Sequence, residues 1–68
     1  MELYQICRRV SEELERRHAG DPMGLVLAKG ELARQTGFLA GLVGRSDPDD
    51  PEKIGKLRQA AAAMNIYV

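Results

Sequence analysis

Cysteine and histidine are almost missing from this sequence of 68 residues, which holds one of each, Cys7 and His18. A disulfide within the chain is therefore excluded, and two such residues cannot supply the four ligands of a structural zinc site. We expect no metal and no cofactor. The stretch "MELYQICRRVSEELERRH" also lacks an apolar run of signal-peptide length, and together with the lone thiol this favours a cytoplasmic protein.

Aromatic residues and an excess of either charge are missing too. The chain has two tyrosines, one phenylalanine and no tryptophan, and its ten basic residues balance ten acidic ones. Proteins that bind single strands need stacking platforms, and proteins that neutralise phosphates usually show a basic excess. No run approaches the ~18 apolar residues of a membrane span. We therefore expect neither a nucleic acid nor a membrane as partner.

The sequence contains no group of residues that forms a recognisable catalytic or metal site. His18 follows two arginines at a predicted helix end, where a cation stabilises the helix. Cys7 lies on an apolar stripe, which indicates a small buried hydrophobe. The segment that contains Asp47, Asp49 and Asp50 lacks the glycine and the glutamate of a calcium-binding loop. We predict that the protein is not an enzyme.

Three helices are marked by their caps and by apolar spacing. The first is predicted over residues 2–18, the second begins at Pro22 after Asp21, and the third runs over 51–65 after Asp50. The fold class expected for 1–68 is a single all-α domain, a helical hairpin with a third C-terminal helix, packed as a small antiparallel bundle. The predicted core comprises Leu3, Ile6, Cys7, Val10, Leu14, Ile54, Leu57, Ala61 and Met64.

The second helix is predicted to continue to Gly44, as a long central helix over 22–44. Leucines recur at seven-residue intervals beside a strip of small residues, so that one face could press closely against another helix. Interior glycines at 30, 37 and 41 would cost roughly 3 kcal/mol of helix propensity, and close packing would have to offset it. The alternative is a break at one glycine. The candidate interface is Leu25, Leu32, Ala33, Gly37, Leu39, Ala40, Gly41 and Gly44.

The same region also matches a second pattern. Ala33, Gly37 and Val43 have the spacing of a small residue, a turn glycine and a buried aliphatic residue, so "ELARQTG" resembles the first helix and turn of the helix-turn-helix superfamily. The recognition helix would then be "LAGLVGRSDPDD", which offers one arginine and three aspartates to a phosphate backbone. This composition disfavours DNA binding.

The phrase "KGELARQTGFLAGLVG", with its Gly-Glu-Leu-Ala and Gly-x-Leu-x-Gly-Leu steps, resembles helices of small phage and prophage proteins. The resemblance implies a small accessory protein of a mobile element, either a virion part or an inhibitor of a host protein. The tail Ile66–Val68 either folds onto the core, with Tyr67 covering its edge, or adds as a strand to a partner's sheet.

A chain of this size buries only about 60% of its unfolded surface, and self-association is a common remedy. We therefore expect a non-enzymatic protein–protein interaction module, a homodimer that binds and modulates a host or partner protein of unknown identity. The alternatives are a small helix-turn-helix DNA-binding regulator and a phage virion structural component.

Overall fold

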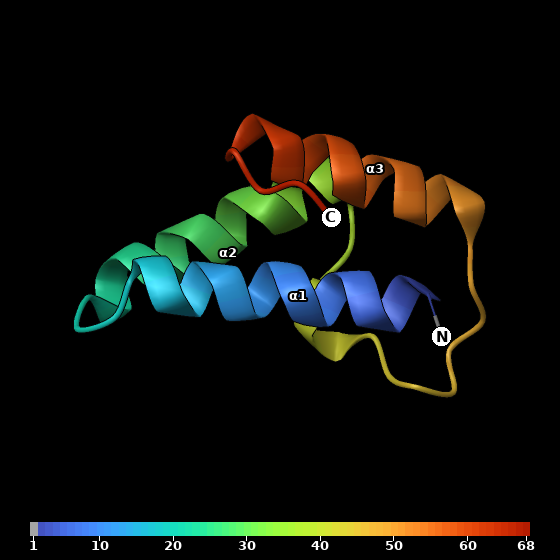
Figure 1. Cartoon of the computed structure of the whole chain (residues 1–68), viewed down its shortest axis with the longest axis horizontal. Helices are drawn as coiled ribbons and strands as arrows, with labels where there is room; N and C mark the ends of the chain where they lie inside the picture. The colour runs from blue at the N-terminus through green and yellow to red at the C-terminus, as the bar shows by residue number, and fades with distance from the viewer. Residues whose placement is uncertain (1) are drawn as a thin grey trace.

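The computed structural model describes residues 2–68, which form three α-helices and one short 3-10 helix, without a strand among them (Figure 1). The two longest helices form a hairpin, and the third packs against both. The prediction of a small all-α bundle is thus confirmed. The elements are α1 (Glu2–Arg17), α2 (Pro22–Thr36), η1 (Ala40–Leu42) and α3 (Pro51–Ala63).

Helix α1 is the central element of the bundle. It contacts α2, α3 and η1, and Figure 1 shows η1 on one side of α1 and α3 on the other. Its apolar residues recur at the i, i+3, i+4, i+7 spacing of one helix stripe and all are buried, while its outer surface carries ion pairs such as Arg8–Glu12. A single stripe therefore provides α1's share of the core.

The two connectors start their helices as the sequence predicts. The Asp21 carboxylate accepts a hydrogen bond from the Gly24 N–H, and the Asp50 carboxylate accepts one from the Glu52 N–H, each at 3.0 Å. A proline follows each aspartate at the first helical position, where its missing N–H would have had no partner. The predicted helix ends at residues 18 and 65 lie one and two residues beyond the observed ends of α1 and α3.

The predicted continuous helix over 22–44 is wrong in its second half, because the chain leaves the helix at Gly37. Gly37 has a φ of 81°, the left-handed conformation typical of a helix C-cap, and its N–H donates to the Ala33 carbonyl at 2.8 Å. The hydroxyl of buried Thr36 lies 2.9 Å from the carbonyl oxygens of both Leu32 and Phe38. It therefore stabilises the turn that follows α2.

The core lies where α1 meets the other elements. Every residue predicted for it is buried except Met64, which is half-buried and packs against the rest. Four further residues that were not predicted for the core are also buried. They are Leu32 on α2, Ala40 on η1, Ala60 on α3 and Ile66 in the tail.

Candidate functional site

The residues predicted to form one continuous helix face do not lie on one face. Leu32 and Ala40 are buried in the monomer's own core, and Gly37 is the C-cap of α2. Gly44 lies in the connector, where its N–H donates to the Asp47 carboxylate at 2.8 Å. Leu25 and Ala33 are half-buried on α2. The predicted leucine and glycine seam is therefore wrong, because the chain turns at Gly37 before the seam can continue.

The turn nevertheless brings four of those residues together with others in an apolar groove. Leu32 is buried, whereas Leu39 is 56% exposed and Leu42 is 76% exposed. Two large apolar side chains, one on the N-cap of η1 and one on its last residue, thus remain in contact with water beside the core. We name this surface the η1 groove, and it is lined by Ser11, Lys29, Leu32, Leu39, Ala40, Gly41 and Leu42.

One ion pair lies at the edge of the η1 groove. The Lys29 ammonium nitrogen lies 3.6 Å from a carboxylate oxygen of Glu15, and both side chains are about half exposed. An exposed pair of this kind contributes little to stability. Lys29 can therefore change partners without a large loss of folding free energy.

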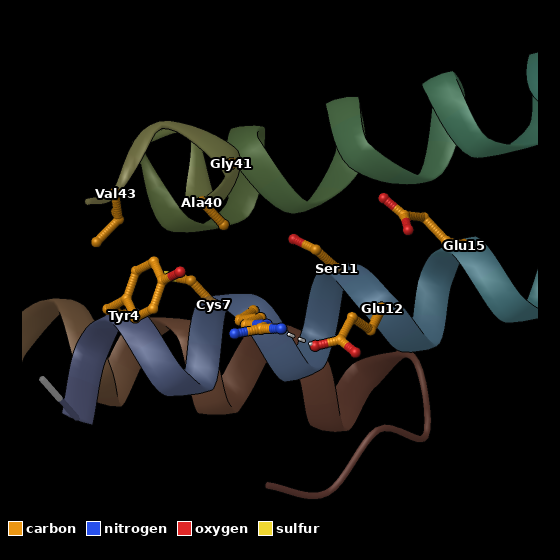
Figure 2. A pocket seen from close by; sticks show the side chains of 9 residues that line it. Tyr4, Cys7, Ser11, Glu12, Glu15, Ala40, Gly41 and Val43 are labelled. Atoms are coloured by element: carbon orange, nitrogen blue, oxygen red, sulfur yellow. Dashed lines mark hydrogen bonds and ion pairs between the residues drawn. The ribbon is translucent and has the colours of Figure 1, made fainter. Parts of the chain in front are cut away.

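A second hollow lies between α1 and η1 and shares Ser11, Ala40 and Gly41 with the η1 groove (Figure 2). Ser11 and Glu15 point from α1 to the side on which η1 lies, and Arg8 binds Glu12 with an N···O distance of 3.1 Å. The hollow is also lined by Tyr4, Cys7 and Val43.

The titratable groups of this hollow do not form a reactive pair. Burial raises the pKa of the Cys7 thiol, which disfavours the thiolate that a nucleophile requires. A hydrogen bond with Arg45 lowers the pKa of the Tyr4 phenol, and the Arg45 guanidinium carbon lies 5.6 Å from the centre of that ring. Within residues 2–68 no three potential ligands gather closely enough to hold a metal ion.

A third surface, which was not predicted from the sequence, is the outer face of α2. Met23, Val26 and Leu27 are each about two-thirds exposed, and Gly30 completes the i, i+3, i+4, i+7 spacing. We name these four residues the α2 outer face. Their spacing was visible in the sequence, but Leu25, Ala28 and Leu32 offer an equally apolar face on the opposite side, and only the folded structure shows which face is covered.

The tail folds onto the core, which was one of the two alternatives predicted for it. Ile66 is buried and Val68 packs against the core, but Tyr67 is 78% exposed and does not cover the edge. Two contacts hold the end of α3 against α1: the Arg17 guanidinium donates to the carbonyl of Met64 and to that of Asn65.

The helix-turn-helix pattern places a turn correctly at Gly37, but the helix that should follow it is missing. Residues 39–50 contain only the three-residue η1 and an irregular connector. Across residues 2–68 no helix combines the length and the apolar character needed to cross a membrane.

No protein-family model, curated protein or solved structure matches this chain. The resemblance to small phage proteins therefore stays a prediction, and the three surfaces must be interpreted from their own residues.

Proposed function

We propose that the protein is a non-enzymatic interaction module that binds another protein in the η1 groove and modulates it. The observation that carries the proposal is the exposure of Leu39 and Leu42 on a short turn beside buried Leu32. An exposed apolar patch with a polar rim is typical of a site where another protein docks.

The rim of the groove defines the chemistry of the segment that would fit. An apolar side chain of the partner would cover Leu39 and Leu42, while Ser11 and Lys29 supply hydrogen-bond donors beside it. Because Lys29 is held only by an exposed pair with Glu15, it can bind a carboxylate of the partner instead. We therefore propose a partner that presents an apolar residue next to an acidic one.

The test uses the whole chain as bait in an extract of its source cells, in three forms. Leu42→Lys places a charge on the η1 groove, and Leu27→Lys places the same charge at a similarly exposed position on α2. We expect a partner that the wild type and Leu27→Lys retain and that Leu42→Lys loses. Titration of the purified partner should then show at least about tenfold weaker binding to Leu42→Lys. Equal retention by all three forms would contradict the proposal.

A further inference from the structure

The hollow drawn in Figure 2, which we name the α1–η1 hollow, meets the η1 groove at a boundary where one ion pair lies. Ser11, Ala40 and Gly41 line both surfaces. Of the paired residues, Glu15 lines the hollow and Lys29 lines the groove. A protein segment that filled both surfaces would therefore pass beside both charges of this pair.

The charges that line the two surfaces are not balanced within either of them. In the α1–η1 hollow, Arg8 is paired with Glu12 at 3.1 Å, so that the Glu15 carboxylate is in excess. The η1 groove has one charged lining residue, Lys29. The hollow thus offers a negative charge to a partner and the groove offers a positive one.

The other charged groups near this part of α1 have contacts of their own. The Arg45 guanidinium carbon lies 5.6 Å from the centre of the Tyr4 ring, and Figure 2 shows Tyr4 and Glu15 at opposite ends of the hollow. His18, about one turn beyond Glu15 on α1, lies 3.8 Å from the Asp21 carboxylate. The excess negative charge therefore remains at the end of the hollow that borders the η1 groove.

An acidic residue of the partner on Lys29 needs a basic residue beside it. The Lys29 ammonium nitrogen lies 3.6 Å from the Glu15 carboxylate, so an acidic group that binds the ammonium also approaches that carboxylate. Like charges at short range repel each other, and the repulsion grows when a partner removes the surrounding water. A basic group of the partner on Glu15 relieves this repulsion, because the four charges then alternate in sign.

We propose that one segment of the partner spans the η1 groove and the α1–η1 hollow, and that it carries an acidic, an apolar and a basic residue. The acidic residue binds Lys29, the apolar residue covers Leu39 and Leu42, and the basic residue binds Glu15. The inference rests on the proposed function and adds to it the second surface and the basic residue.

Gly41 lies on the path that such a segment takes between the two surfaces. Its φ is not positive, and a Cβ added there would meet nothing within 4 Å. Neither the backbone conformation nor the packing of the monomer therefore requires glycine at this position. A large side chain would obstruct the boundary that the segment crosses. Gly41→Leu should keep the circular dichroism of the wild type and weaken binding of the segment.

The probe is a library of random short peptides, selected on the immobilised wild-type chain. We expect the selected peptides to combine an acidic, a large apolar and a basic residue. The decisive variant carries Glu15→Lys together with Lys29→Glu, which keeps an ion pair at this place and reverses its direction. The selected peptides should bind this variant at least about tenfold more weakly. Peptides in which the acidic and basic residues are exchanged should prefer the variant to the wild type.

The matched control reverses another exposed pair, by Glu31→Arg together with Arg34→Glu on α2. Neither of these residues lines the η1 groove or the α1–η1 hollow. The control variant should therefore bind the selected peptides as the wild type does. The circular dichroism of both reversed variants should match that of the wild type, because each of them retains an ion pair.

Each result decides the inference. It is overturned by a selection that returns no peptide or only peptides without a basic residue. It is also overturned if the reversed Glu15–Lys29 pair or Gly41→Leu leaves binding unchanged, or if the exchanged peptides do not restore binding. Leu42→Lys separates this inference from the proposed function. Peptides that bind Leu42→Lys unchanged contradict the proposed function, whereas peptides that lose binding to Leu42→Lys and keep it with the reversed pair overturn only this inference.

Discussion

Cys7 is the only cysteine, and it lies in the core with 2% of its surface exposed. Because burial raises the pKa of its thiol, the thiolate fraction at pH 8 is smaller than that of a free cysteine. We expect Ellman's reagent to react slowly with the folded protein and rapidly in denaturant. The control is Ser11→Cys, whose additional thiol lines the hollow in Figure 2 and should react at once. A fast reaction of native Cys7 would contradict the packing described for α1.

At the scale of the single residue, Thr36 is also important, because its buried hydroxyl stabilises the turn after α2. Thr36→Val keeps the shape of the side chain but leaves the Phe38 carbonyl without this donor. We expect a loss of about 1–2 kcal/mol in the free energy of unfolding, measured by urea denaturation. Thr36→Ser retains the hydroxyl and should lose less. A valine variant as stable as the wild type would show that the hydroxyl is dispensable.

At the scale of the element, two glycines seven residues apart have opposite roles. Gly37 ends α2 with a φ of 81°, whereas Gly30 has helical neighbours on both sides and open space around its missing Cβ. Gly37→Ala should therefore lower the free energy of unfolding by about 1 kcal/mol, and Gly30→Ala should raise it by about as much. Urea denaturation measures both. Two changes of the same sign would contradict the assignment of the helix end.

The helix starts could be predicted because Asp21 and Asp50 each precede a proline at the first helical position of a run without further proline. The choice between a helix that continues through Gly37 and one that ends there could not be made from the sequence. The sequence does not distinguish a glycine inside a helix from a glycine at a helix C-cap. Which of the two conformations a glycine adopts depends on contacts made elsewhere in the structure. Here the chain turns so that Leu32 and Ala40 both enter the core beside α1. The η1 groove follows from that turn, and periodicity, which assumes a continuous helix, could not find it.

At the scale of the whole molecule, the domain is small enough for a single buried residue in its tail to decide whether it folds. Ile66 is 5% exposed, and deletion of its side chain by Ile66→Ala should cost about 2–5 kcal/mol. A single core of this size rarely supplies more than about 3–5 kcal/mol in total. We expect the variant to be largely unfolded by circular dichroism, while Tyr67→Ala, at an exposed position, remains folded. Equal stability of the two variants would show that the tail is not part of the core.

Glu13 is one of the carboxylates whose titration we expect to contribute to acid stability. The pKa of Glu13 is lowered by its hydrogen bonds with Arg16 and with Arg17, the residue that binds the end of α3. A lowered pKa in the folded state stabilises the protein above the ordinary carboxyl pKa, and this contribution is lost as pH falls through the folded value. We therefore expect Glu13→Gln to lose less stability than the wild type between about pH 5 and pH 3, measured by urea midpoints. An unchanged acid limb would contradict this.

The position of α1 at the centre of the bundle also determines when the protein can fold. Its first turn is capped by Asp49, which accepts the Leu3 N–H at 3.0 Å, and Glu2 pairs with Arg58. In its last turn, Arg17 donates hydrogen bonds to the carbonyls of Met64 and Asn65, which follow α3. Because α1 precedes α2, η1 and α3 in the chain, it is synthesised before every element that it packs against. Its apolar stripe therefore remains accessible to chaperones and proteases until α3 and the tail have been synthesised.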